Sequence, residues 1–430
     1  MIRMIGIWNT FTYIKKSKIS INIYNLMNIL FLTLVGSENI NERGIYNDLM
    51  RKFRDNGHNV FIVSPYERRF NKKTKLFDYG SIKLLKIWTP NIQKTSIFEK
   101  GLTTLILENI FLKGIKKYFP DISFDLILYS TPPITFTKVI KYIKKRDNAK
   151  TYLLLKDIFP QNAVDIGLIK KNSIIHKFFR RKEKELYRIS DTIGCMSLAN
   201  VEYVIKNNQE LDKNKIEVNP NSITPINIGV TQEEIRLIRK KYGIPLHSVL
   251  FVYGGNLGLP QGIDFLIDVL NDQKNKLDVY FAIIGSGTMF SKLKKWFDMN
   301  LPLNAKLYSQ MPKSDYDNFL NCSDVGMIFL DKRFTIPNFP SRLLSYLEMK
   351  KPVILATDKN TDIGRIAEKN NFGLWSENGD LNTFTKNINK LKTDPVLRKE
   401  MGMNGYNYLL ENYTTEHSYS IIMKHFENVH

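Results

Sequence analysis

A glycine-rich loop in the second half of the chain has the composition of a phosphate-binding turn. In VLFVYGGNLGLPQG (residues 249–262), an apolar run ends at Tyr253 in two adjacent glycines, and a helical pattern begins at Ile263. Glycine lets backbone N–H groups approach an anion closely, and a strand, a glycine-rich turn and a helix in succession commonly hold phosphate. The loop has neither the Gly-Lys-Ser/Thr of a P-loop nor a strict GxGxxG fingerprint, so it does not support an ATPase or a nicotinamide-dependent enzyme. A plain strand-to-helix turn is the alternative.

Two further loops have features that suit an anionic ligand. IGSG (284–287) again ends an apolar run with glycines, and PNFPSRLLS (337–345) leads into a helical pattern. Pro340 and Ser341 are typical of a helix start, with Ser341 as a natural N-cap and Arg342 in the first turn. A helix N-terminus with an arginine suits a diphosphate, because free N–H groups attract the anion and a guanidinium can bind it bidentately. Alternatively, the helix is simply capped and Arg342 points to solvent.

The elements that would position these loops alternate between apolar runs of strand length and helical patterns. Continuous apolar runs separated by helices are typical of parallel strands buried on both faces. The runs are 28–35, 59–65, 83–90, 125–130, 151–155, 191–197 and 215–221, then 248–255, 278–287, 305–309, 323–331, 351–358 and 372–375. The sequence therefore predicts an α/β fold with two doubly wound, Rossmann-like domains. Ligands of such sheets bind beyond the carboxyl ends of the strands, so we expect the domains to face each other across a cleft.

A polar bridge, NPNSITPINIG (219–229), separates the two series of strands. The expected units are an N-terminal extension (1–26), a first Rossmann-like domain (27–223), a second Rossmann-like domain (224–410) and a C-terminal helix that packs back on the first domain (411–430). Because MNILFLTLV reads as a first strand, Met27 is a candidate start and the extension is optional. Residues 19–37 are uncharged and long enough to span a bilayer, but asparagines interrupt them, and we predict no transmembrane helix.

The positive charge of the chain is concentrated in its first half. The 430 residues carry a net charge of +21, of which residues 1–220 contribute +18 and residues 221–430 only +3. Such a one-sided field fits nucleic acid, an anionic membrane surface, or a phosphorylated lipid or sugar, although a generally lysine-rich composition is the alternative. Cys195 and Cys322 lie far apart and the six histidines have no metal-ligand spacing. This argues for a reducing compartment and against a disulfide scaffold or a metalloenzyme.

Taken together, the runs VYGGNLGLPQGIDFLIDVL, IIGSG and IPNFPSRLLSYLEMKKPVILATD resemble the C-terminal nucleotide-sugar domain of GT-B glycosyltransferases. The resemblance is closest to family 4, in the branch that serves bacterial capsule and O-antigen assembly and includes N-acetylfucosaminyl transferases. In the first half, RKFRDNGHNVFIVSP and YLLLKDIFPQNAVDIGLI agree with it. The similarity covers about residues 27–415 and is strongest over 249–358.

This resemblance implies roles for particular residues. Arg342 would neutralise the diphosphate leaving group, and Asp157 would face the acceptor or the anomeric carbon. The implied donor-binding residues are Gly44 near the diphosphate, Gly254, Gly255, Asn256 and Gly258 at the phosphates, Gly285, Gly287, Ser341 and Ser345 in the other two loops, Gln310 and Met311 beside the base, and Asn338 and Phe339 along the sugar.

The chain also departs from the family pattern. The family often has two glutamates eight residues apart around the last motif, where this chain has Pro337 and Ser345. Ser345 could bond one ribose hydroxyl but not clamp both. Basic residues that are common in the first glycine loop are replaced by Asn256 and Gln261, which assigns more of the phosphate binding to Arg342.

By this resemblance, we expect a retaining glycosyltransferase that moves an N-acetylated sugar from a uridine diphosphate donor to a polyprenyl-diphosphate-linked saccharide in capsular or O-antigen synthesis. We expect no metal and no cofactor, since the nucleotide sugar is a substrate. A nucleotide-sugar 2-epimerase shares the architecture and is the alternative, although the sequence has no convincing acid/base set for it. A basic protein that binds nucleic acid is less well supported, because no recognisable module is present.

The expected location is the cytoplasmic face of the cell membrane, with an anionic membrane surface as a partner and no nucleic acid. The stretch 80–119 mixes aromatic and long aliphatic residues with lysines and has little acid. Such a stretch can lie among lipid headgroups while its lysines meet anionic lipid. Ordinary packed helices are the alternative for these residues.

Overall fold

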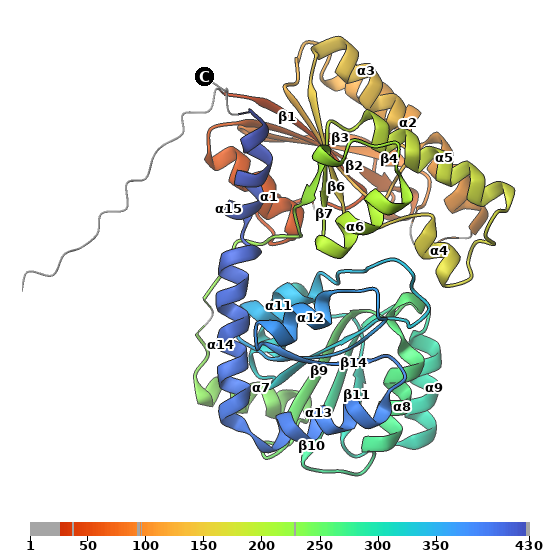
Figure 1. Cartoon of the computed structure of the whole chain (residues 1–430). Helices are drawn as coiled ribbons and strands as arrows, with labels where there is room; N and C mark the ends of the chain where they lie inside the picture. Colours follow the sequence, from red (N-terminus) through yellow and green to blue (C-terminus); the bar gives the residue numbers. More distant parts are fainter. Residues whose placement is uncertain (1–25, 37, 93–94, 96, 228, 427–430) are drawn as a thin grey trace, which may run out of the picture.

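The computed structural model describes residues 26–36, 38–92, 95, 97–227 and 229–426. The extension predicted over residues 1–26 lies outside the described residues, apart from its last position. The chain forms two α/β domains, one above the other in Figure 1, each built around its own sheet. The prediction of two doubly wound α/β domains is confirmed.

The first sheet has eight strands in the order β3-β4-β2-β1-β5-β6-β7-β8. Its strands are β1 (Asn28–Leu32), β2 (Asn59–Glu67), β3 (Lys75–Tyr79), β4 (Ile82–Thr89), β5 (Leu126–Ser130), β6 (Lys150–Leu155), β7 (Thr192–Cys195) and β8 (Ile216–Val218). Every neighbouring pair is parallel except β3 and β4, which are antiparallel. The central strands are almost entirely buried, which is why they read as apolar runs.

Helices cover both faces of this sheet. They are α1 (Ile45–Asp55), α2 (Ile97–Tyr118), α3 (Thr137–Asp147), α4 (Gln161–Asp165), α5 (Ile174–Ile189) and α6 (Leu198–Asn207). On one face, α2, α3, α5 and α6 share a hydrophobic core with the sheet. On the other face, α1 buries an apolar side that includes Leu49, Met50 and Phe53.

The second sheet has six strands, all parallel, in the order β11-β10-β9-β12-β13-β14. Its strands are β9 (Val249–Asn256), β10 (Val279–Ser286), β11 (Ala305–Tyr308), β12 (Val325–Phe329), β13 (Val353–Thr357) and β14 (Gly373–Glu377). Its helices are α7 (Gln232–Tyr242), α8 (Ile263–Gln273), α9 (Phe290–Asn300), α10 (Lys313–Asn321), α11 (Arg342–Glu348), α12 (Ile363–Lys369), α13 (Leu381–Thr393) and α14 (Pro395–Asn412). One core lies on each face of the sheet.

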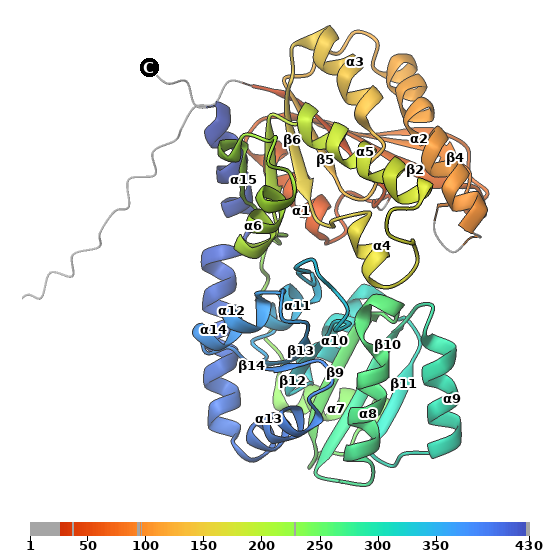
Figure 2. The ribbon, with the colours of Figure 1, turned by 45° about the vertical axis from the view of Figure 1, so that its right-hand side comes forward.

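Two segments of the chain cross between the domains side by side. The backbone N–H of Ile223 donates to the carbonyl of Tyr413 at 3.0 Å, and that of Thr415 donates to the carbonyl of Ile223 at 3.0 Å. The second segment continues into α15 (Thr415–Met423), which lies beside α1 on the first domain (Figures 1 and 2). There Tyr419 and Met423 join the core under α1.

Two expectations for the first domain need correction. Strand β3 was not predicted, because it is an antiparallel edge strand with only partial burial and lacks an apolar run. The stretch 80–119 does not form a single surface segment. Its first part is β4, a strand within the sheet, and the described part of α2 packs Leu107, Phe111 and Ile115 into the core. Among the described residues, no helix combines the length and apolarity needed to cross a bilayer.

Candidate functional site

The two glycine loops lie next to each other at the carboxyl ends of β9 and β10. Gly285 pairs with Gly255 in the sheet, and the N–H of Leu257 donates to the carbonyl of Ser286 at 2.9 Å. Gly285 has a φ of +156°, and a Cβ there would lie 1.9 Å from the carbonyl oxygen of Gly255. Only glycine therefore allows the two backbones to approach this closely. The two loops form one continuous rim of the second sheet.

Arg342, in the first turn of α11, points towards the first of these loops. Its Nη2 donates to Oε1 of Gln261 at 2.6 Å, and its guanidinium carbon lies 4.3 Å from the ring centroid of Tyr253. A Cβ at Gly255 would lie 3.7 Å from the same Nη2. The three loops that were singled out in the sequence thus meet at one place.

One donor of this guanidinium is left without a partner. Nη1 of Arg342 is buried and makes no hydrogen bond within the described protein. A buried donor without an acceptor costs about 1–3 kcal/mol. The arrangement suits an anion that brings its own acceptor oxygens, because a guanidinium next to open glycine backbone can hold such a group.

The start of α11 differs in one respect from the prediction. Ser341 does occupy the N-cap position, but its side chain makes no capping hydrogen bond there. The helix is also short, at seven residues. The Arg342 side chain, rather than a capped helix N-terminus, is therefore the main feature for an anion at this point.

The residues predicted beside the sugar and the base lie around the same rim. The N–H of Asn338 donates to Oγ1 of Thr361 at 2.9 Å, so this backbone group is already occupied, whereas its buried Nδ2 has no partner among the described residues. Phe339 packs against Tyr413, with ring centroids 5.9 Å apart. Oε1 of Gln310 accepts from Oγ of Ser286 at 3.1 Å, which joins the loop after β11 to the second glycine loop.

The remaining residues that were predicted to bind the donor lie in or next to the loops already described, or in α11. Gly254 donates its N–H to the hydroxyl of Tyr346 at 3.2 Å, and a Cβ there would lie 1.9 Å from the Tyr316 hydroxyl. Gly258 precedes the short turn that contains Gln261. The other predicted residues in this group are Asn256, at the exposed end of β9, Gly287, which follows β10, the partly buried Met311, and the half-buried Ser345 within α11.

The two sites predicted in the first domain have local partners. Gly44 begins α1, and its N–H donates to Oδ1 of Asp48 at 3.0 Å. Both carboxylate oxygens of Asp157, just after β6, accept from Nδ2 of Asn162 at 2.8 and 2.7 Å.

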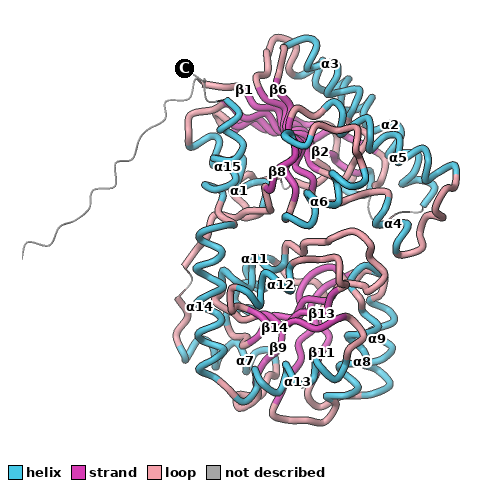
Figure 3. The backbone as a smooth tube through the Cα atoms, in the orientation of Figure 1, coloured by secondary structure: helices cyan, strands magenta, loops and turns pink. Residues whose placement is uncertain are grey.

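The loops at the carboxyl ends of the first sheet reach the second domain at other points. Nδ2 of Asn200, which follows β7, donates to the carbonyl of Pro337 at 2.7 Å. The N–H of Thr335 donates to Oδ2 of Asp165, at the end of α4, at 2.8 Å. Figure 3 shows the two sheets with loops filling the region between them. The carboxyl ends of strands in both domains therefore lie at one boundary, where ligands of such sheets bind.

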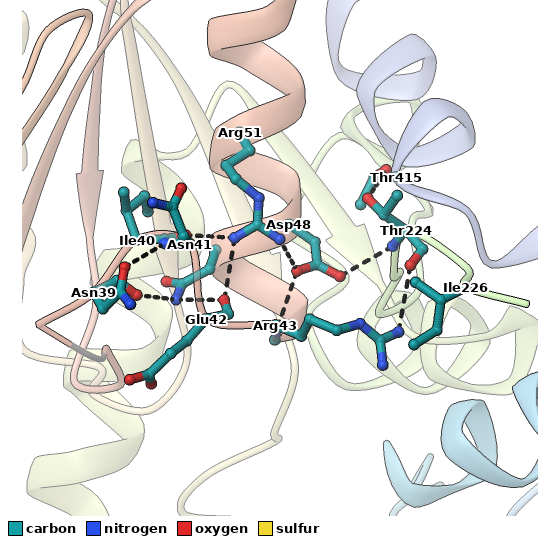
Figure 4. A network of polar contacts seen from close by, with 12 residues as sticks. Asn39, Ile40, Asn41, Glu42, Arg43, Asp48, Arg51, Thr224, Ile226 and Thr415 are labelled. Carbon is teal, nitrogen blue, oxygen red and sulfur yellow. Dashed lines mark hydrogen bonds and ion pairs between the residues drawn. The ribbon is translucent and has the colours of Figure 1, made fainter. Parts of the chain in front are cut away.

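A polar network at this boundary involves residues that the sequence reasoning missed. The buried carboxylate of Asp48 accepts from the N–H groups of Gly44 and Thr224, each at 3.0 Å, and pairs with Arg51 (Figure 4). It thereby joins the loop before α1 to the connection between the domains. In the sequence, Asp48 stands out only as an aspartate in the first turn of a helix. Such residues are common because they interact favourably with the helix dipole, so the position did not indicate a contact between domains.

Arg43, in the same loop, makes ion pairs with the second domain. It pairs with Glu348 at the end of α11 and with Asp317, whose Oδ2 lies 3.5 Å from its Nη1. The Glu348 side chain is 2% exposed, and burial raises its pKa despite the opposing effects of the Ile226 N–H and Arg43. Arg43 and Glu348 are 305 positions apart, so no local pattern could reveal the pair.

Two lysines of the first domain are also perturbed. Burial lowers the pKa of Lys86, within β4, to about 8, and that of Lys156, just after β6, to about 7. Their Nζ atoms donate to the carbonyls of Gly36 at 2.7 Å and Asn219 at 2.9 Å. The sequence did offer a sign that Lys86 is buried, because this lysine lies inside an apolar run. Among the described residues, no group of His, Cys, Asp and Glu side chains could hold a metal ion.

The comparisons with known proteins agree on one class. Residues 234–408 match the family model for glycosyl transferases group 1. The chain is 22% identical over 332 residues to WbjE of Pseudomonas aeruginosa, named as a probable glycosyltransferase, with 73% of this chain and 80% of that protein covered. It is 20% identical over 254 residues to WcaI of Escherichia coli (strain K12), named for colanic acid biosynthesis, with 57% and 60% covered.

Solved structures show the same fold at low sequence identity. The sucrose-phosphate synthase of Thermosynechococcus elongatus has a TM-score of 0.70 and 12% identity, covering 94% of this chain and 99% of that one. Anabaena Alr3699/HepE, solved in complex with UDP, has a TM-score of 0.65 and 15% identity, covering 94% and 100%. The two facing α/β domains thus match the GT-B fold. The second domain matches the model for group 1 glycosyl transferases, and the chain is a glycosyltransferase.

Proposed function

We propose that the chain transfers a sugar from a uridine diphosphate sugar to a lipid-linked saccharide, with retention of configuration, during capsular or O-antigen polysaccharide assembly. The observation that carries the proposal is the unpaired, buried Nη1 of Arg342 beside the paired glycine loops of β9 and β10. A diphosphate would supply the missing acceptor. HepE, with the same fold, was solved with UDP, and WcaI is named for colanic acid biosynthesis; both support this choice.

In the proposed reaction, the bond between the anomeric carbon and the diphosphate oxygen breaks while an acceptor hydroxyl bonds to the same face of that carbon. The hydroxyl proton passes to an oxygen of the departing diphosphate, so no protein nucleophile is required. Charge grows on the leaving group as the bond breaks. Arg342 and the glycine N–H groups would stabilise this charge more strongly in the transition state than in the bound donor.

The first domain would present the acceptor. Asp157 is proposed to face the acceptor hydroxyl, with Asn162 holding its carboxylate in place. The donor is proposed to be N-acetylated, no cofactor takes part, and the enzyme acts at the cytoplasmic face of the membrane on a polyprenyl-diphosphate-linked saccharide. The excess of +18 in residues 1–220 supports an anionic acceptor on this side.

The test is the turnover of Arg342→Ala and Arg342→Lys with nucleotide sugars and a lipid extract. Removal of one such donor typically lowers kcat by a factor of about 10²–10³. We expect a loss of this size for Arg342→Ala, a smaller one for Arg342→Lys, and normal turnover for Arg236→Ala on the exposed face of α7. Near-normal turnover of Arg342→Ala would contradict the proposed role. Conversion of the donor sugar without acceptor would instead indicate a 2-epimerase.

A further inference from the structure

We propose that α5 and the loop before it form a docking surface for an anionic lipid bilayer. This inference deepens the proposed function, since it names the surface by which an enzyme with a lipid-linked acceptor would reach that acceptor. We call the segment from Leu168 to Arg188 the α5 surface. It lies outside the stretch 80–119 that the sequence suggested for this purpose.

Large apolar side chains are exposed together at the start of this surface. Leu168 is 66% exposed, Ile174 88%, Ile175 59% and Phe178 38%. Single exposed apolar residues are common in soluble proteins, but several within so short a segment mark an interaction site. The chain leaves them exposed, although it buries Leu186 and Tyr187 of the same helix.

Cationic side chains surround these apolar groups. Lys170, Lys171 and Lys177 are exposed and make no ion pair within the described protein. A hollow of about 390 Å³ lies along the helix. It is lined by Lys177, Arg180, Arg181, Lys184 and Arg188, with Asn172 and His176. Four of these cations already pair with Glu183, Glu185 or Glu210, so within the described residues Lys177 is the lining cation that makes no ion pair. Free lysines beside a basic hollow match the phosphates of anionic lipid headgroups in charge.

The helix has the geometry to lie flat on a membrane. Its 16 residues span about 24 Å. Its buried side, with Glu183, Leu186 and Tyr187, faces the core of the first domain. At helical spacing, Ile174, Phe178 and Arg181 fall on the opposite side. Glu185 falls there too, and it pairs with Arg181 and Lys182. An exposed helix face with apolar and basic residues can insert its apolar groups into the headgroup region while its cations contact lipid phosphates.

The α5 surface begins where the domains meet. The carbonyl of Ile166 accepts from Nη1 of Arg333 at 3.4 Å, and Asp165 binds Thr335, so the end of α4 touches the second domain. Leu168 follows two positions later. Figure 2 shows α4 next to the second domain and α5 running along the first. A bilayer on this surface would therefore hold a lipid-linked substrate beside the boundary that contains the carboxyl ends of the strands.

The test is flotation of the full chain with vesicles of phosphatidylcholine, with and without 30% phosphatidylglycerol. The variant Lys170→Gln/Lys171→Gln/Lys177→Gln removes only exposed, unpaired charges. Each cation near an anionic surface changes binding about fivefold, so we expect at least a tenfold loss of binding to the anionic vesicles. Phe178→Ser with Ile174→Ser should also reduce binding. The matched control is Lys292→Gln/Lys294→Gln/Lys295→Gln on α9, which loses the same charge and should bind normally.

A second readout separates this inference from the proposed function. With a water-soluble acceptor analogue, the α5 variants should keep full activity, because their positions do not touch the donor site. The inference is overturned if the lysine variant floats like the unmodified chain, if both vesicle types bind equally, or if binding disappears after nuclease treatment. If the lysine variant loses vesicle binding but the unmodified chain is inactive on nucleotide sugars, the docking surface is supported and the proposed function is overturned.

Discussion

Nη2 of Arg342 lies 2.6 Å from Oε1 of Gln261, and this contact joins α11 to the glycine loop after β9. Gln261 is the neutral partner of this pair, and its side-chain oxygen accepts the hydrogen bond from the guanidinium.

This contact predicts that Gln261 positions Arg342. A hydrogen bond to a charged group contributes about 1.5–3 kcal/mol, so Gln261→Leu should lower kcat/KM for the donor by about 10- to 100-fold. The melting temperature should change little, because the turn is partly exposed. Gln209→Leu, an exposed glutamine of the first domain, is the control for both measurements. Equal kinetics for the two variants would show that Arg342 is positioned without Gln261.

Two glycines predict opposite outcomes for stability. Gly285→Ala would place Cβ 1.9 Å from the Gly255 carbonyl oxygen at a φ of +156°. We therefore expect the free energy of unfolding to fall by about 2–4 kcal/mol and donor binding to be lost. Gly44→Ala adds a Cβ with no atom within 4 Å and an extended φ of 171°, so the fold should be unaffected. If Gly44 approaches the bound diphosphate, Gly44→Ala will nevertheless be about tenfold less active. Full activity of that variant would remove Gly44 from the donor site. Chemical denaturation and donor kinetics measure both effects.

The ion pair of Arg43 with Glu348 predicts energetic coupling between the domains. Each single variant, Arg43→Met and Glu348→Gln, should destabilise the chain, and the double variant should be more stable than the sum of the two effects predicts. We expect a coupling energy of about 1–3 kcal/mol from a double-mutant cycle in urea. Lys313→Met, next to the same cluster at Asp317, serves as a comparison with a more exposed cation. A coupling energy near zero would mean that the ion pair does not hold the loop before α1 against α11.

Lys156 predicts a pH dependence of stability. Burial lowers its pKa from 10.5 to about 7, so the folded chain holds this proton less tightly than the unfolded chain. The neutral amine therefore stabilises the fold fully above pH 10.5, and this contribution is lost as the pH falls towards 7. Lys156→Met removes the loss, so it should stabilise the protein more at pH 7 than at pH 10, relative to the unmodified chain. Urea midpoints at both pH values test this, with the exposed Lys141→Met as the control. A constant difference between the two pH values would contradict the prediction.

The strands were largely predictable because burial on both faces leaves a local, continuous signal. The runs at 125–130 and 151–155 became β5 and β6, whose residues are almost all buried. The edge strand β3 left no such signal, because an antiparallel edge strand needs apolar residues on one face only. Its partner β4 was predicted because it is mostly buried and reads as an apolar run.

The sequence by itself determined the α/β alternation, the glycines that let β9 and β10 turn closely together, and the arginine at the start of α11, since each depends on neighbours a few positions away. Only the tertiary structure decided that Arg342 points to Gln261, 81 positions distant, that Arg43 pairs with Glu348, and that Ile174 and Phe178 stay exposed. The physical reason is that periodicity and turn chemistry act locally, whereas the direction of a side chain and its partner depend on how separate elements pack. The sequence of α5 is typical of an amphipathic helix, and only the packing of this helix on the core determines which of its sides stays exposed.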